Sequence, residues 1–139
     1  IVSRMDEIQA AILNIKLKSY KKNLNTRRRI AKMYLSKINN HLVELPIITE
    51  DTLHALHLFV IRVVKRNKFR NYLSHHGIET MIHYTLPVHL QKAYKNRIPL
   101  YFPLKYTENI MKSIVSIPIY PNLSLHKVKY IIEIINSFK

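Results

Sequence analysis

The stretch Leu56-His57-Leu58-Phe59-Val60-Ile61-Arg62-Val63-Val64 decides the fold class of this chain. It is a nearly continuous apolar run rich in β-branched residues, which is typical of a strand buried inside a sheet. Two further segments of strand type follow at residues 78–84 and 114–119, and prolines at 118 and 121 close the second of them. We therefore predict a small sheet of about three strands.

Helical patterns lie on both sides of these strands. Apolar residues recur at helical spacing over residues 3–37, with Ser3 as the expected N-cap and acidic residues in the first turn. This predicts one long or broken helix. A short amphipathic segment ends at Gly77, the only glycine, at a position where a helix end needs a left-handed residue. Two more helices are expected at residues 107–113 and 124–138, the latter capped by Ser124.

The predicted order is helix, strand, helix, strand, helix, strand, helix. Such alternation favours an α/β domain in which helices cover a small sheet, although it leaves the strand directions open. At 139 residues and 16.6 kDa the chain is long enough to bury one core. The chain starts at Ile1, and we expect it to be part of a longer polypeptide.

The composition limits the cellular compartments and the kinds of chemistry that we expect. The absence of cysteine removes disulfides and thiolate nucleophiles, and it suits a reducing compartment. No apolar run approaches the roughly 18 residues of a membrane-spanning helix, and no secretory leader is visible. We expect a cytoplasmic protein with no membrane partner.

The charge is extreme, because 23 Lys and Arg stand against 8 Asp and Glu. A net charge of +15 would attract nucleic acid, membrane surfaces or anionic substrates alike. The chain has no aromatic-rich RNA signature and no zinc-finger spacing, and lysine on solvated faces would give the same count. A basic nucleic-acid-binding module is therefore the less favoured alternative.

Eight histidines raise the question of a metal site. The groupings are close in sequence: His54 with His57, His75 with His76, and His83 with His89. None has the i, i+4 spacing with glutamate of helical zinc sites, so we expect no metal. The pair before Gly77 is expected to cap helix carbonyls, and His57 to be a hydrogen-bonded core histidine.

Residues 82–91, Ile-His-Tyr-Thr-Leu-Pro-Val-His-Leu-Gln, form the most site-like segment. Imidazoles and a phenol leave the predicted strand end for a loop fixed by proline, where binding groups are common. The chain has no GxSxG elbow, no Walker loop and no GxGxxG, and one glycine cannot build a glycine-rich phosphate cradle. Independent nucleotide chemistry is therefore not expected.

Five motifs occur in a fixed order along the chain. They are SRMDEIQAAIL at 3–13, HLFVIR at 57–62, GIET at 77–80 with IHY at 82–84, HLQ at 89–91, and SIPIYP at 116–121. Together they resemble the C-terminal third of the DegT/DnrJ/EryC1/StrS sugar aminotransferases, over essentially the whole chain.

The resemblance implies the C-terminal domain of a fold-type I, pyridoxal-phosphate-dependent homodimer. Such enzymes move an amino group from glutamate to a keto group on a nucleotide-linked deoxysugar that enters surface polysaccharides. Residues 1–40 would join the large domain and the dimer interface, and residues 41–139 would form the small domain. In the family the Schiff-base lysine lies upstream of the matched region, so we expect this chain to be inactive alone. A split-gene or decayed remnant is the alternative.

The resemblance also assigns site residues. Ser3 and Arg4 match a stretch that reaches the cofactor phosphate of the partner subunit, although Val2 stands where the family usually has asparagine. His83 and Tyr84 match a His-Tyr pair of the substrate region, and His89 is expected to bind substrate with them. The IHY form and the following HLQ favour members that aminate a 3-keto position.

Overall fold

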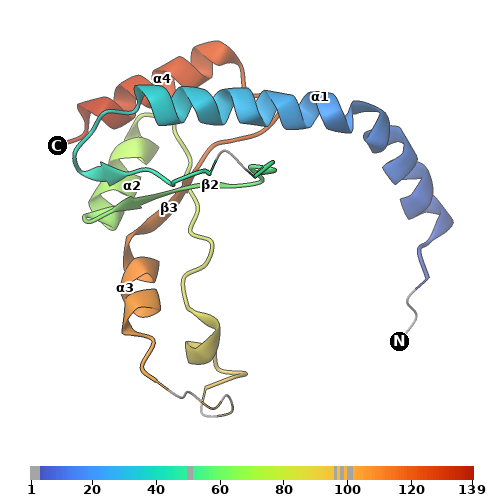
Figure 1. Ribbon diagram of the computed structural model, residues 1–139. Coiled ribbons are helices and arrows are strands. Elements are labelled where there is room, and N and C mark those ends of the chain that lie inside the picture. The colour runs from blue at the N-terminus through green and yellow to red at the C-terminus, as the bar shows by residue number, and fades with distance from the viewer. Residues whose placement is uncertain (1–3, 50–51, 96, 98, 100–101) are drawn as a thin grey trace.

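The computed structural model describes residues 4–49, 52–95, 97, 99 and 102–139. In chain order the elements are α1 (Glu7–Lys37), β1 (Val43–Glu44), β2 (Phe59–Val63), α2 (Arg66–His75), the 3₁₀ turn η1 (Val88–Leu90), α3 (Lys105–Ser113), β3 (Ile114–Ile117) and α4 (Leu125–Ser137). This is the expected small α/β domain with a long first helix (Figure 1).

The sheet has the order β1-β2-β3, and both neighbouring pairs are antiparallel. Along β2 the side chains of Phe59, Ile61 and Val63 are buried and alternate with half-buried ones. Antiparallel pairing places Phe59 opposite Ile117 and Ile61 opposite Val115, so both strands send apolar side chains to the same face. That face is one side of the core.

Helices α1, α2 and α4 cover this face. Tyr34 of α1 lies on Phe59 with ring centroids 5.1 Å apart, and Phe69 of α2 meets Phe138 edge-on at 5.0 Å. Buried Ile and Val of α4 complete the cluster. η1 and α3 lie away from the sheet, on the opposite side from α1 and α4 (Figure 1).

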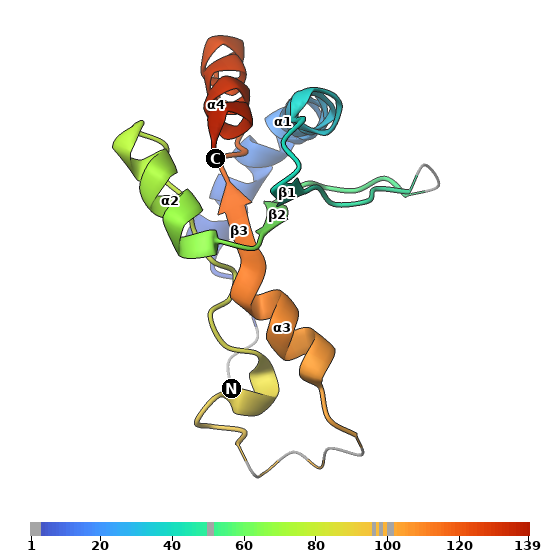
Figure 2. The same ribbon diagram turned by 90° about the vertical axis from the view of Figure 1, so that its left-hand side faces the viewer.

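Helix α1 begins later than the sequence predicted. Its N-cap is Asp6, whose carboxylate accepts a hydrogen bond from the Ile8 amide at 2.9 Å, so the predicted N-cap at Ser3 is wrong. The helix is continuous over 31 residues. Its last turns are buried in the core, whereas its first half projects away from the sheet with apolar side chains such as Ile8 and Ile15 exposed (Figures 1 and 2).

Two predicted helix ends are confirmed. Gly77 follows the end of α2 with φ of +70°, and its amide donates to the Ser74 carbonyl at 3.0 Å. The Ile78 amide donates to the Leu73 carbonyl at 2.9 Å, which completes a Schellman motif with both apolar side chains buried. At the start of α4 the Ser124 hydroxyl accepts from the Lys127 amide.

One predicted strand of the sheet is wrong. Residues 78–84 do not form a strand, since Ile78 belongs to the Schellman turn and Met81 alone makes a β-bridge, to Ser116. The remaining strand of the sheet is instead β1, only two residues long, which pairs with β2 at the opposite edge of the sheet through Val43 opposite Val63. A strand this short carries no readable alternation, so tertiary pairing determines it.

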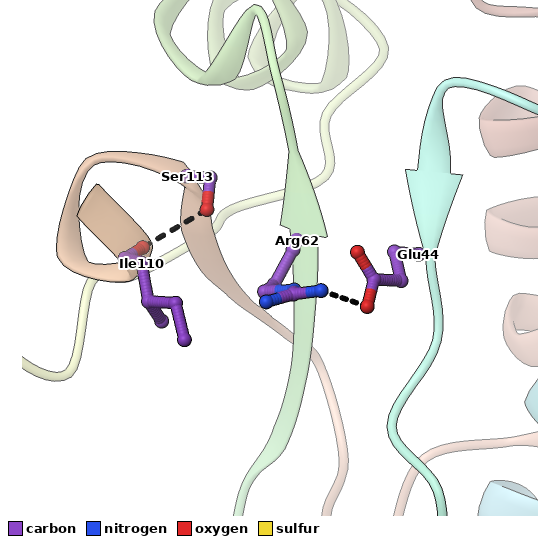
Figure 3. Close-up of polar contacts among 4 residues, drawn as sticks. All are labelled: Glu44, Arg62, Ile110 and Ser113. Carbon is purple, nitrogen blue, oxygen red and sulfur yellow. Dashed lines mark hydrogen bonds and ion pairs between the residues drawn. The ribbon is translucent and has the colours of Figure 1, made fainter. Parts of the chain in front are cut away.

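Two polar contacts lie close to the strands of the sheet. Glu44 of β1 and Arg62 of β2 are cross-strand partners and form an ion pair (Figure 3). At the end of α3 the Ser113 hydroxyl donates to the Ile110 carbonyl at 2.9 Å (Figure 3).

No helix within the described ranges is long and apolar enough to span a bilayer.

Tyr34 offers a test of the core that depends on pH. Its ring is fully buried, and its hydroxyl donates to the Pro118 carbonyl at 2.8 Å. Burial, and secondly the charge of Tyr120, raise the pKa of Tyr34 above its ordinary value. The native state therefore holds this proton more tightly than the unfolded chain. The resulting stability is complete below about pH 10 and is lost as the pH rises further.

Replacing Tyr34 with phenylalanine is expected to lower the free energy of unfolding by about 1–2 kcal/mol at neutral pH, because a carbonyl loses its donor. Above about pH 10 the variant should lose stability less steeply than the wild type, by up to about 1.4 kcal/mol per pH unit. Urea unfolding across this pH range measures both, with the exposed Tyr106→Phe in α3 as control. If the free energies of unfolding of Tyr34→Phe and wild type fell in parallel above about pH 10, the raised pKa of Tyr34 would be contradicted.

Candidate functional site

The site-like segment is anchored by the Schellman turn and by β3. After Ile78 the chain runs beside β3, where the Met81 amide donates to the Ser116 carbonyl at 3.1 Å and the Ser116 amide donates back at 2.8 Å. This pair of bonds aligns residues 82–84 with the edge of the sheet. The position of His83 is therefore set by Gly77 on one side and by β3 on the other.

His83 and Tyr84, the predicted substrate residues, lie just after the Met81 bridge. The His83 ring is half-buried, and its Nδ1 lies 2.8 Å from the Ser116 hydroxyl oxygen. The Tyr84 ring packs edge-on against it, with centroids 5.6 Å apart and planes at 87°, while 68% of Tyr84 remains exposed. The peptide bond between the two residues is cis.

An open cleft of about 620 Å³ borders His83. Its apolar walls come from the end of β3 and from α4, including Ile117, Ile119 and Ile131. Its polar groups are His57, Glu79, Ser116, Tyr120, Lys127 and Tyr130, together with His83. An apolar cleft with a few convergent polar groups is the usual form of a small-molecule site.

His57 is exposed and lines this cleft, so the prediction of a core histidine is wrong. The reason lies in the preceding backbone. Leu56 is buried with φ of +51°, a left-handed conformation uncommon for a branched residue, and its amide donates to Nδ1 of His54 at 2.8 Å. This turn buries Leu56 and leaves the His57 side chain outside the core.

Arg27 of α1 holds this turn in place. Its Nη1 donates to the carbonyls of Leu56 at 3.3 Å, His57 at 3.1 Å and Ile119 at 2.7 Å. One guanidinium thus joins α1 to the turn before β2 and to the segment after β3. Two of the three acceptor residues, His57 and Ile119, line the cleft together with His83. Carbonyl acceptors leave no signal in a sequence.

His89 is separated from the other predicted substrate residues. It is buried in η1, and its Nε2 lies 3.1 Å from a carboxylate oxygen of Glu108 in α3. The contact ties η1 to α3, and His89 is not among the residues that line the cleft. Its predicted role in substrate binding stays a prediction.

Arg4 lies before the N-cap of α1 and is exposed. The part of α1 from its start at Glu7 to Arg27, whose guanidinium contacts the cleft residues His57 and Ile119, is about 30 Å long at 1.5 Å per residue and separates Arg4 from the cleft of the same chain. Ser3, the other predicted phosphate contact, and Val2 lie outside the described residues. The structure therefore does not bring Arg4 together with His83 and Tyr84.

The two histidines before Gly77 make contacts within α2. Nδ1 of His75 lies 2.7 Å from the Asn71 carbonyl, and Nδ1 of His76 lies 2.8 Å from the Tyr72 carbonyl, which confirms that both cap the end of α2. Within the described part of the chain no three His, Asp or Glu side chains gather as metal ligands would.

Sequence comparison identifies relatives with known activities. The family model of the DegT/DnrJ/EryC1/StrS aminotransferases matches residues 1–136. The chain is 46% identical over 137 residues to dTDP-3-amino-3,6-dideoxy-alpha-D-galactopyranose transaminase of Aneurinibacillus thermoaerophilus. It is 34% identical over 137 residues to dTDP-3-amino-3,4,6-trideoxy-alpha-D-glucose transaminase of Streptomyces venezuelae. The matches cover 98% of this chain and 37% and 36% of these relatives.

Comparison with solved structures supports the same family. The crystal structure of S. venezuelae DesV in complex with a ketimine intermediate superposes with a TM-score of 0.88 at 34% identity, covering 96% of this chain and 36% of that one. The chain thus spans little more than a third of the proteins that it matches.

Proposed function

Because the chain belongs to the DegT/DnrJ/EryC1/StrS aminotransferase family, we propose that it is the C-terminal part of a pyridoxal-phosphate-dependent nucleotide-sugar aminotransferase. Glutamate would be the amino donor and a nucleotide-linked keto-deoxysugar the acceptor. The observation that carries this proposal is the 46% identity to a sugar transaminase over 98% of the chain. The 3-amino sugars in the names of both relatives support a 3-keto acceptor.

The residues present suit part of the cofactor site. Arg4 is exposed at the outer end of α1, where a guanidinium can make bidentate contacts to a phosphate. Every lysine of the chain lies within the described residues, and every one is exposed. A lysine that carries the cofactor reacts best in a desolvated pocket, which none of these occupies. When bound, pyridoxal phosphate supplies the electron sink for amino transfer.

The positions of His83, Tyr84 and Arg4 in the structure support separate roles for them. His83 and Tyr84 would contact the sugar substrate from the sheet edge beside the cleft. Arg4, held about 30 Å along α1 from the cleft of its own chain, would serve the cofactor phosphate of a second subunit in a homodimer. The exposed apolar residues on the first half of α1, such as Ile8 and Ile15, would be covered in that assembly.

The test compares the chain alone with a chimera. The chimera joins this chain to the part of the A. thermoaerophilus transaminase that it does not cover. Both are assayed with pyridoxal phosphate, glutamate and a dTDP-linked 3-keto-6-deoxysugar. We expect turnover by the chimera and none by the chain alone. Turnover by the chain alone would overturn the proposal that its cofactor lysine lies elsewhere, and an inactive but folded chimera would count against the sugar-transaminase assignment.

A further inference from the structure

Ser116 is the most constrained polar residue beside the candidate site. It is only 6% exposed and lies on β3 between Val60 of β2 and the Met81 bridge. Its amide and carbonyl are both bonded to Met81, at 2.8 and 3.1 Å. The backbone of Ser116 is therefore fixed, and only the rotation of its hydroxyl remains free.

The hydroxyl has a single hydrogen-bond partner among the described residues, Nδ1 of His83 at 2.8 Å. The bond can form in two ways. If Nδ1 carried the proton and donated it, the serine hydroxyl hydrogen would be left without an acceptor in a buried position, which costs free energy. If the hydroxyl donates to Nδ1, both groups are satisfied.

We propose that Ser116 is a positioning residue whose hydroxyl donates to Nδ1 of His83 and holds the neutral imidazole in the Nε2–H tautomer. The other ring nitrogen, Nε2, has no partner among the described residues. It lies on the far side of the ring from Ser116, and His83 borders the cleft. In this proposal Nε2–H is the hydrogen-bond donor that His83 offers to a ligand in the cleft.

The tautomer defines the ligand chemistry at this point. A group that meets Nε2–H has to be an acceptor, such as a carbonyl, hydroxyl or phosphate oxygen. Identifying that acceptor as a keto or hydroxyl oxygen of a sugar rests on the proposed function. The tautomer itself rests only on the geometry of Ser116 and His83.

Nitrogen-15 NMR of the histidine rings distinguishes the tautomers directly. In the uniformly labelled wild-type chain at about pH 8.5, where ordinary imidazoles are neutral, we expect the His83 ring to be almost entirely in the Nε2–H form. The signals are assigned from their loss in His83→Gln. In Ser116→Ala the ratio of the Nε2–H to the Nδ1–H form should fall about fivefold, the worth of one hydrogen bond.

Two further variants separate positioning from general disturbance. Ser116→Thr keeps the hydroxyl and should keep the wild-type tautomer. Ser113→Ala removes a hydroxyl that bonds the Ile110 carbonyl and should leave the His83 signals unchanged. A predominant Nδ1–H form in the wild type, or in Ser116→Thr, would overturn the proposal. So would an unchanged tautomer ratio in folded Ser116→Ala. These spectra require neither cofactor nor sugar, so they can fail or succeed independently of the chimera assay.

Discussion

Replacing Arg27 with alanine is expected to lower the free energy of unfolding by about 3 kcal/mol, a large share of the stability of a domain this size. One guanidinium nitrogen donates to three carbonyls, and bonds from a charged donor are stronger than neutral ones. Its loss would leave the carbonyls of Leu56 and Ile119 short of a donor where the chain is partly buried. Chemical denaturation followed by circular dichroism measures the change.

The same substitution should release the turn beside the cleft. The left-handed Leu56 is held by His54 and Arg27, and without the arginine the backbone can relax toward an ordinary conformation. Arg27→Lys should recover only part of the stability, since one ammonium cannot reproduce the geometry of the guanidinium. The matched control is the exposed Arg29→Ala on the same helix, with a change below about 0.5 kcal/mol. Equal effects of the two alanine variants would refute the bracing role of Arg27.

Replacing His83 with alanine in the active chimera is expected to lower kcat/KM by about 10- to 100-fold. The substitution would remove the hydrogen bond that we propose from Nε2–H to the substrate, and one such bond in a site that excludes water is worth a factor of this size. Steady-state kinetics with varied keto-sugar concentration give kcat and KM separately. A fall in kcat at unchanged KM would place the contact in the transition state rather than in substrate binding.

His83→Gln is the informative companion variant. A glutamine amide nitrogen reaches roughly where Nε2 stands and can donate, so this variant should retain more activity than His83→Ala. His126→Ala in α4 removes an exposed histidine that does not line the cleft and serves as the control. Activity of His83→Ala within about twofold of the parent chimera would contradict the proposed contact between His83 and the substrate.

Local signals in the sequence predicted the parts of the fold that local physics determines. Gly77 and Ser124 mark helix ends because their conformations or side chains satisfy terminal backbone groups, and both ends are confirmed. The apolar run gave β2, although its ends at Leu56 and Val64 lie outside the strand. The start of α1 was misplaced because Ser3 and Asp6 are both good caps, and the sequence alone does not rank them.

Features that depend on distant partners could not be predicted. β1 exists because Val43 and Glu44 meet β2, and residues 78–84 fail to form a strand because the Schellman turn uses Ile78. At the site, the resemblance to a family selected His83, which borders the cleft, and Tyr84, which packs against its ring. It could not reveal that Ser116 contacts His83 or that Arg27 reaches Ile119, because these residues are 33 and 92 positions apart.

The single glycine has a consequence for chirality. A Cβ built on Gly77 would meet no atom within 4 Å, so the position has room for a side chain. What excludes an L-residue is the backbone torsion alone, since φ of +70° suits glycine or a residue of the opposite hand. A D-alanine introduced there by chemical synthesis would fit the turn and would also restrict the unfolded chain. The orientation of His83, six residues on, thus depends on a handedness requirement rather than on space.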